Sequence, residues 1–208
     1  MIVDDIDTLI ARARGLAAAG SRAILGIAGA PGGGKSTLAD KVVAALGDAA
    51  VLVPMDGFHL AQPELVRLGR RDRMGAPDTF DACGYVALLA RLRSPYEVVY
   101  APEFRREIEE PIAGAIAVSP EVPLVVTEGN YLLVDDGDWA AVRPLLDEAW
   151  YVDMDEATRL DWLIARHVAF GKSPEAARAW VMRSDQANAA VVAATRERAD
   201  VIARLALA

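Results

Sequence analysis

The chain has 208 residues, of which 53% are hydrophobic and 25% charged, proportions typical of a folded domain and not of a disordered chain. Its formal net charge of −8 repels phosphate backbones at long range, so nucleic acid is excluded as an expected partner. A single cysteine, Cys83, cannot form an intrachain disulfide, which fits a reducing compartment. The acidic start does not resemble a signal peptide, and no apolar run reaches the roughly 20 residues that span a bilayer. We therefore expect a cytoplasmic protein without membrane contact.

The spacing of apolar residues predicts alternating helices and strands along the chain. Helices are expected at 3–19, 36–46, 84–93, 156–170 and 174–184, with a short one after Pro63. Buried strands are expected at 22–28, 50–55, 123–127, 148–153 and 199–205, and residues 96–118 are expected to form a small hairpin insertion. This order predicts an α/β domain with a parallel sheet of five strands and helices on both faces.

A glycine-rich loop follows the first strand and opens a helix. Residues 29–36 read Gly29-Ala30-Pro31-Gly32-Gly33-Gly34-Lys35-Ser36, the G-x-x-x-x-G-K-[ST] pattern in the strand-to-helix setting it requires. Glycines let successive backbone N–H groups point at phosphate oxygens, and the helix N-terminus adds its positive end. We expect these residues and Thr37 to bind ATP, with Lys35 on the β and γ phosphates and Ser36 on Mg²⁺. A glycine-rich turn without a ligand is the alternative.

Two acids follow strands and should meet this loop, because ligands bind at the carboxyl ends of parallel strands. Asp56 precedes Gly57, where its carboxylate could accept the proton of an attacking hydroxyl or hold a metal; a hydrogen bond within a turn is the alternative. Glu128 ends the strand at 123–127, a position that holds Mg²⁺ in phosphate-loop proteins, with a carboxylate facing solvent as the alternative.

Basic residues gather in two parts of the chain. Arg67, Arg70, Arg71 and Arg73 precede the hairpin insertion, and Arg105 and Arg106 lie within it; such groups clamp anions or form a solvated face. The two late helices carry Arg159, Arg166, Arg178 and Arg183, and they would form a lid that closes over the transferred group. His59 is a candidate substrate contact, with packing in the core or a turn as an equal alternative.

Four motifs in order resemble the phosphoribulokinase, uridine kinase and bacterial pantothenate kinase family. They are Met55-Asp56-Gly57-Phe58-His59-Leu60, Gly75-Ala76-Pro77-Asp78-Thr79-Phe80-Asp81, Glu128-Gly129-Asn130-Tyr131-Leu132-Leu133 and Thr195-Arg196-Glu197-Arg198-Ala199-Asp200. Short members labelled fructose transport system kinase look most similar. The resemblance implies a P-loop kinase fold, with Asp56 as general base and Glu128 in the magnesium site. It further implies that Arg166 faces the phosphates, that Arg196 lies near the adenine and that Arg106 faces the substrate.

The expected function is transfer of a phosphoryl group from ATP, with Mg²⁺, to a hydroxyl of a small molecule such as the sugar fructose. Asp56, Lys35 and Arg166 are the catalytic candidates, and His59, Arg106 and Tyr131 are the substrate-binding ones. A uridine-type nucleoside or pantothenate is the alternative acceptor, and a nucleotide-dependent switch or hydrolase is the alternative from another class. Arg105 and Met74 depart from the family pattern near the expected substrate pocket.

The predicted organisation is one kinase domain over 1–208. Its lid is expected at roughly 156–190 and its substrate-side insertion at roughly 57–118. A homodimer is a possible assembly.

Overall fold

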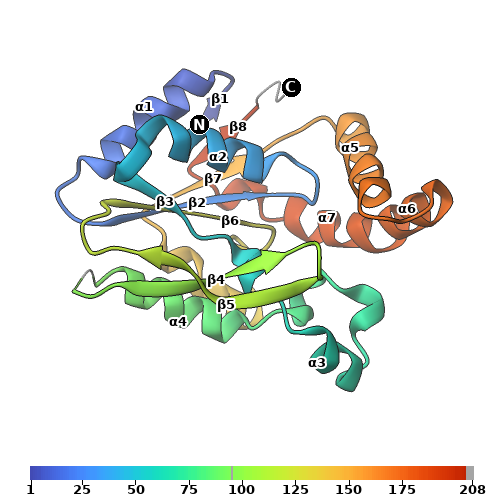
Figure 1. Cartoon of the computed structure of the whole chain (residues 1–208). Coiled ribbons are helices and arrows are strands. Elements are labelled where there is room, and N and C mark those ends of the chain that lie inside the picture. The colour runs from blue at the N-terminus through green and yellow to red at the C-terminus, as the bar shows by residue number, and fades with distance from the viewer. Residues whose placement is uncertain (95, 205–208) are drawn as a thin grey trace.

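A computed structural model describes residues 1–94 and 96–204. A parallel sheet of six strands lies at its centre, in the order β1-β8-β7-β2-β6-β3 (Figure 1). Its strands are β1 (Ile2–Val3), β2 (Ala23–Gly29), β3 (Ala50–Leu52), β6 (Leu124–Gly129), β7 (Glu148–Val152) and β8 (Val201–Ala203). The predicted α/β class is confirmed. The sheet has one strand more than expected, because β1 is too short to show a period in sequence and is held at the edge by pairing with β8.

Helices cover both faces of the sheet, and the side chains of each strand alternate between two cores. Helices α1 (Ile6–Ala17) and α2 (Lys35–Leu46) lie on one face, and α4 (Ala82–Leu92) lies on the other (Figure 1). In β2, Leu25 and Ile27 pack with α1 and α2, whereas Ile24 and Ala28 face the core of α4. A strand buried on both sides reads as a continuous apolar run, which is why β2 could be found from its composition.

Strand β3 is shorter than the predicted 50–55, and the difference decides where Asp56 lies. Pro54 has no N–H to donate to a neighbouring strand, and the chain turns after it into a 3₁₀ helix at Met55–Phe58. A Cβ at Gly57 would lie only 2.3 Å from the carbonyl oxygen of Pro102, so this turn packs directly on the hairpin. Asp56 is thereby fixed between the main sheet and the hairpin.

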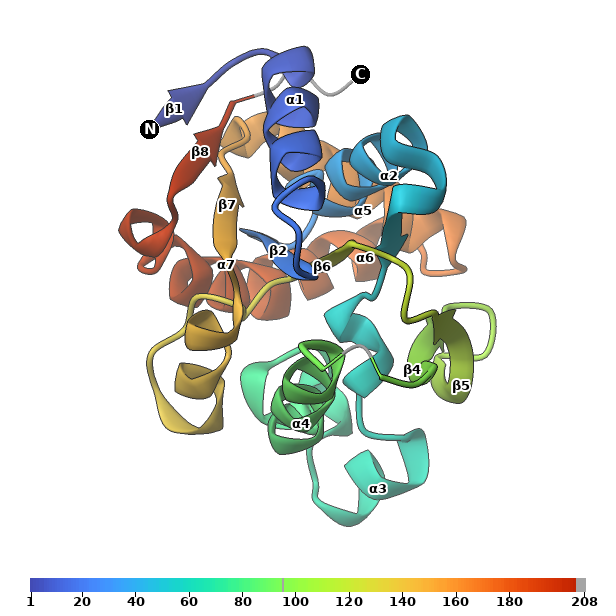
Figure 2. The ribbon, with the colours of Figure 1, turned by 90° about the vertical axis from the view of Figure 1, so that its left-hand side faces the viewer.

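The hairpin expected within residues 96–118 is present as one antiparallel pair of strands that stands apart from the main sheet (Figure 2). Its strands are β4 (Val99–Arg105) and β5 (Glu110–Val118). The short helix near Pro63 is α3 (Gln62–Arg67), with the proline in its first turn, where the missing N–H costs nothing.

Two late helices project beyond the sheet, α5 (Glu156–Ala169) and α6 (Pro174–Trp180) (Figure 1). The predicted helix at 174–184 does not end there. It continues through a π-helical segment at Val181–Asp185 into α7 (Gln186–Ala193), whose sequence is mostly alanine and valine and gives no amphipathic signal. The predicted strand at 199–205 is present as β8, and residue 205 lies outside the described residues.

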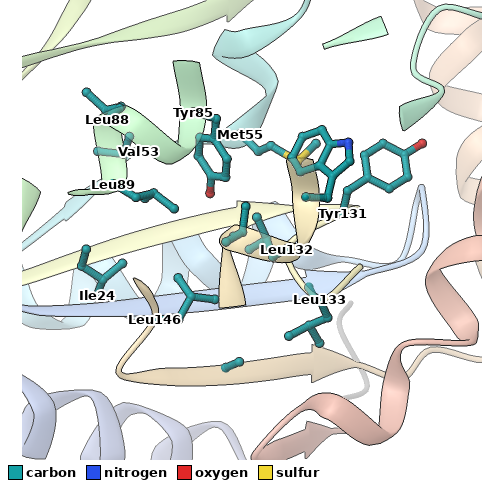
Figure 3. Packing of buried hydrophobic residues seen from close by; sticks show 14 of the residues in the cluster. Ile24, Val53, Met55, Tyr85, Leu88, Leu89, Tyr131, Leu132, Leu133 and Leu146 are labelled. Atoms are coloured by element: carbon teal, nitrogen blue, oxygen red, sulfur yellow. The ribbon is translucent and has the colours of Figure 1, made fainter. Parts of the chain in front are cut away.

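A buried hydrogen-bond chain joins the α4 face to the strands that carry the two acids. The hydroxyl of Tyr85 lies 2.6 Å from Oγ1 of Thr127, which donates to the carbonyl oxygen of Val53 at 2.6 Å. Figure 3 shows Tyr85, Val53 and Met55 packed together in this core. The bonds fix the end of β3 against β6, and so fix the segments leading to Asp56 and Glu128. Within the part of the chain that the structure describes, none of the helices has the length and apolar character needed to cross a membrane.

Candidate active site

The glycine-rich loop connects β2 to α2, as the motif predicts. Gly32 and Gly34 have positive φ values of 73° and 83°, a conformation that glycine adopts without strain. The N–H of Gly33 donates to the carbonyl oxygen of Ala30 at 2.9 Å, and a Cβ at Gly33 would stand 2.8 Å from that oxygen. The loop therefore needs glycine at these positions, and it presents the N-terminus of α2, whose first N–H groups have no acceptor within the helix.

Lys35 lies buried at the base of this loop, and its Nζ donates to the carbonyl oxygen of Ala30 at 3.0 Å. Burial lowers the pKa of Lys35 to about 8, although the nearby carboxylates of Glu128 and Asp56 oppose the shift. The ammonium group is thus poorly solvated and is not in an ion pair within 4 Å among the described residues. Such a cation gains much from an incoming anion.

Ser36 and Glu128 meet at the end of β6, where Oγ of Ser36 donates to Oε1 of Glu128 at 3.2 Å. Burial raises the pKa of Glu128, and repulsion by Asp56 adds to the effect, while the charge of Lys35 partly offsets it. Two hard oxygen donors therefore lie side by side next to the phosphate loop, the donor type that Mg²⁺ prefers.

Asp56 lies on the 3₁₀ turn after β3, and its carboxylate Oδ2 accepts from Nη2 of Arg106 at 3.3 Å. Burial alone would raise the pKa of Asp56. The charge of His59 when its ring is protonated, together with the positive charges of Arg106, Lys35 and Arg166, outweighs burial, so the net pKa is below the ordinary value. About 27% of the Asp56 side-chain surface stays accessible, which leaves an ionised carboxylate facing a cleft.

The cleft contains two adjoining cavities. One, of about 370 Å³, lies over the phosphate loop and is lined by Gly32–Thr37, Arg106, Trp162 and Arg166. The other has a volume of about 530 Å³, and we name it the acceptor cavity after the hydroxyl acceptor that the sequence predicts. It begins at the loop and extends past Asp56, Glu128 and His59 toward the hairpin and α6. The structure therefore places the loop, both acids, His59, Arg106 and Arg166 around one cleft, and the roles assigned to them from sequence stay predictions.

Helix α5 brings two arginines to the phosphate loop in different ways. Arg166 lines both cavities, and its burial lowers its pKa, with nearby Arg106 acting in the same direction. Arg159 is buried, and its Nη1 donates to the carbonyl oxygen of Pro31 at 3.1 Å. Leu163 of the same helix packs so closely that a Cβ at Gly32 would lie 2.4 Å from its Cγ. The helix therefore packs directly on the loop.

His59 stands beside Asp56 in an aromatic stack. Its ring centroid lies 4.0 Å from that of Phe80 and 4.6 Å from that of Phe104. Its Nδ1 lies 2.8 Å from the carbonyl oxygen of Asp56. Burial lowers the pKa of His59 despite the opposing charge of Asp56, so the imidazole presents a mainly uncharged wall to the acceptor cavity.

Two predicted contact residues do not line either cavity. Tyr131 is fully buried, and its hydroxyl donates to the carbonyl oxygen of Gly75, so it supports the pocket wall and its predicted direct contact with the acceptor is not favoured. Arg196 pairs with Asp153 at 3.0 Å and with Glu197 at 2.7 Å. Its contact with the adenine stays a prediction.

Several cavity residues were missed by the sequence reasoning. They are Gln62, Phe104, Asn130, Trp162, Phe170 and Trp180, together with Asn188 and the pair formed by His167 and Asp185. Asn130 was within reach of the sequence, because it follows Glu128 in a quoted motif. The others come from the hairpin, α3 and residues 162–188, and only the folded chain places them against the cleft.

Comparison with known proteins agrees with this geometry. The profile of the Phosphoribulokinase / Uridine kinase family matches residues 24–206. A crystal structure from Silicibacter sp. TM1040, of a protein provisionally named a fructose transport system kinase, is 35% identical with a TM-score of 0.87, over 96% of this chain and 99% of that one. A protein from Schizosaccharomyces pombe, provisionally named uridine kinase C227.14, is 32% identical over 81% of this chain and 76% of its own length.

The uncharacterized protein YggC of Escherichia coli is 30% identical over 88% of this chain and 78% of its own length. The matched region includes the glycine-rich loop, Asp56, Glu128 and helices α5 and α6. The chain therefore belongs to the phosphoribulokinase/uridine kinase family of P-loop kinases, a membership that implies the use of ATP.

Proposed function

We propose that the chain transfers the γ-phosphoryl group of ATP to a hydroxyl of a small molecule. The observation that carries this proposal is that one cleft combines the phosphate loop with an ionised Asp56 and with Arg106 and Arg166. Phosphoryl transfer has a loose transition state, so catalysis depends mainly on positioning and on stabilising charge. The proposed unit is a single kinase domain with its lid near 156–190 and its substrate-side insertion near 57–118.

Nucleotide binding follows from the loop itself. The N–H groups from Gly32 to Thr37 would surround the β and γ phosphates at the N-terminus of α2. Lys35 would then exchange its bond to the Ala30 carbonyl for phosphate oxygens, since a poorly solvated ammonium is stabilised by an anion.

The residues present fit a magnesium ion. Among residues 1–94 and 96–204, no three side chains of His, Cys, Asp or Glu form a ready-made metal cage. This agrees with Mg²⁺, which usually takes one or two protein oxygens and completes its octahedron with phosphate oxygens and water. Ser36 and Glu128, 3.2 Å apart, would be its protein ligands. When bound, the ion would neutralise charge on the phosphates, and Glu128 would give up any proton that its raised pKa retains.

Asp56 would receive the acceptor's proton. As the hydroxyl oxygen forms its bond to the γ phosphorus, the O–H proton passes to Oδ of Asp56 and the bond to the bridging oxygen of ADP breaks. The carboxylate is already ionised at neutral pH because its pKa is lowered. Arg106 and Arg166 flank this point and would stabilise the negative charge on the transferred group.

The lid helices would exclude water. Arg159 and Leu163 hold α5 against the loop, so the wall formed by Trp162 and Arg166 covers the phosphates. Exclusion of water favours transfer of the phosphoryl group to the acceptor over its transfer to water. This preference distinguishes a kinase from a nucleotide-dependent switch or hydrolase, which transfers the group to water.

The test is release of ADP from Mg·ATP in the presence of sugars including fructose, of nucleosides including uridine, and of pantothenate. We expect ADP release that depends on one acceptor class, with a phosphorylated product detected by mass spectrometry. ADP release at the same rate with and without every acceptor would contradict the kinase proposal and favour a hydrolase.

A further inference from the structure

Three cations at the outer part of the acceptor cavity have no role in the proposed transfer of the phosphoryl group. They are Arg71, Lys172 and Arg183, here called the outer cation cluster, and all three line the cavity that also contains Asp56. Among the described residues none of the three is in an ion pair with a carboxylate, in contrast to most arginines near them. Their position in the cavity raises the question of which ligand they would bind.

Arg71 differs from the other arginines of its segment. Its neighbours are paired with carboxylates, Arg67 with Glu64 and both Arg70 and Arg73 with Asp78. Arg71 alone of the four lines the cavity, where its Nε donates to the amide oxygen of Gln62 at 2.9 Å. Part of its guanidinium stays available for a planar anion, which arginine binds with two parallel hydrogen bonds.

Lys172 and Arg183 come from the lid and lie over the same ring. Nζ of Lys172 is 5.1 Å from the ring centroid of Trp180, and Cζ of Arg183 is 5.5 Å from it. Nη2 of Arg183 also donates to the main-chain carbonyl oxygen of Asp72 at 3.3 Å. This bond brings the lid cations next to the segment of Arg71, so the three cations form one group at the mouth of the cavity.

Carboxylates near the cluster do not neutralise it. Asp185 accepts from Nε2 of His167 at 2.9 Å and is held there. Asp72 and Glu109 also line the cavity, and neither is in an ion pair among the described residues. These two carboxylates would repel an anion placed beside them. We therefore expect the anion to bind at the guanidinium groups of Arg71 and Arg183, close to the ring of Trp180.

We propose that the acceptor carries its own anionic group, a carboxylate or a phosphate ester, which the outer cation cluster holds while the reacting hydroxyl faces Asp56. The inference rests on the proposed kinase function and narrows its acceptor class. A neutral sugar such as fructose, or a nucleoside, would leave the cluster unused. An acid or a phosphorylated sugar would use both ends of the cavity of about 530 Å³.

Matched acceptor pairs test the inference. Each pair differs in the anionic group: pantothenate with panthenol, glycerate with glycerol, and fructose 6-phosphate with fructose. We expect ADP release with an anionic member, at a kcat/KM about 10–100-fold above its neutral partner, as for a charge-assisted hydrogen bond. The pair that responds distinguishes a carboxylate from a phosphate ester. A neutral member that equals or exceeds its anionic partner would overturn the inference and leave the kinase function intact.

Binding measurements keep the two proposals apart. With the protein saturated with Mg²⁺ and a non-hydrolysable ATP analogue, calorimetry with the same compounds should give heat only for an anionic member. Heat from the nucleotide but none from any anionic compound would count against the anionic acceptor, whereas absence of heat from the nucleotide would count against the kinase function itself.

Substitutions locate the effect. Arg71→Gln and Arg183→Gln should each raise KM for the anionic acceptor about 10–100-fold, with the neutral partner little affected. Arg178→Gln is the matched control, because Arg178 is an exposed arginine of α6 that does not line the cavity. Equal KM values in all three variants, with melting temperatures unchanged, would place the anion elsewhere and overturn the inference.

Discussion

The guanidinium of Arg106 lies against the carboxylate of Asp56, with 3.3 Å between Nη2 and Oδ2. Arg106 follows β4 of the hairpin, and Asp56 lies on the turn after β3, so the contact joins the hairpin to the main sheet. The cation is one of the charges that keep the proposed base ionised. Three consequences for activity follow from this arrangement and from the buried lysine opposite.

Replacement of Arg106 should move the acidic limb of the pH–activity profile. The Arg106 cation is one of the charges that hold the pKa of Asp56 below its ordinary value, and the proposed base acts only when ionised. In Arg106→Gln the pKa of Asp56 rises, so kcat/KM should begin to fall at a higher pH than in the wild-type protein. A profile measured from pH 4 to 8 checks this. An acidic limb that stays in place while the rate drops would assign Arg106 to charge stabilisation alone.

Removal of the Asp56 carboxylate should abolish most turnover without affecting nucleotide binding. Asp56→Asn keeps the shape of the side chain but cannot accept a proton, so kcat should fall by roughly 10²–10⁴. The dissociation constant for Mg·ATP, measured by calorimetry, should change little, because the phosphate loop is intact. Asp40→Asn is the control, since Asp40 is exposed on α2 and lines neither cavity. Unchanged turnover in Asp56→Asn would remove Asp56 from the role of base.

Nucleotide affinity should weaken as the pH rises through the pKa of Lys35. Burial brings this pKa to about 8, so above that pH the free protein increasingly holds a neutral amine. Bound phosphates favour the ammonium form, and binding should then take up a proton, with affinity falling about tenfold for each pH unit above 8. Calorimetry at pH 7 and pH 9 in buffers of different ionisation enthalpy measures both quantities.

Two lysine variants complete that experiment. Lys35→Met should bind ATP more weakly and lose the dependence on pH in this range. Lys41→Met should keep it, because Lys41 is exposed on the same helix and lines neither cavity. Proton uptake that persists in Lys35→Met would assign the titration to another group.

The site could be predicted from sequence where chemistry and chain position coincide. The glycine loop and Asp56 come after β2 and β3, and Glu128 lies at the carboxyl end of β6. Such strand ends share one edge of a parallel sheet. The prediction placed Asp56 directly after its strand, whereas Pro54 ends β3 early and the acid lies on a 3₁₀ turn. Asp56 nevertheless lies at the cleft, as predicted for its position, because Gly57 packs on the hairpin and holds the turn there.

The parts that could not be predicted depend on contacts between distant segments. Tyr131 shares a motif with Glu128, yet only the folded chain shows that it is buried behind the cavity lining, with its hydroxyl donating to the carbonyl oxygen of Gly75. Arg159 and Arg166 are both arginines of helix α5. Their different roles depend on which face of α5 meets the loop, and a sequence with four arginines in this region does not reveal that.

Loss of Arg159 should loosen the lid and lower stability. Its guanidinium is buried, donating to the carbonyl oxygen of Pro31 and to the side chain of Gln186, so one residue ties α5 and α7 to the phosphate loop. Arg159→Met leaves these acceptors without their donor, which should cost about 1–3 kcal/mol in the free energy of unfolding. Urea titration measures this loss, and Arg178→Met on α6 serves as the exposed control.

The same variant should also affect the nucleotide site, because Pro31 belongs to the loop that surrounds the phosphates. We expect weaker binding of Mg·ATP, and a higher rate of ATP hydrolysis relative to transfer, since a loosened lid admits water to the phosphates. A variant that unfolds at lower urea but keeps the wild-type ratio of transfer to hydrolysis would show that Arg159 supports the fold without controlling access to the site.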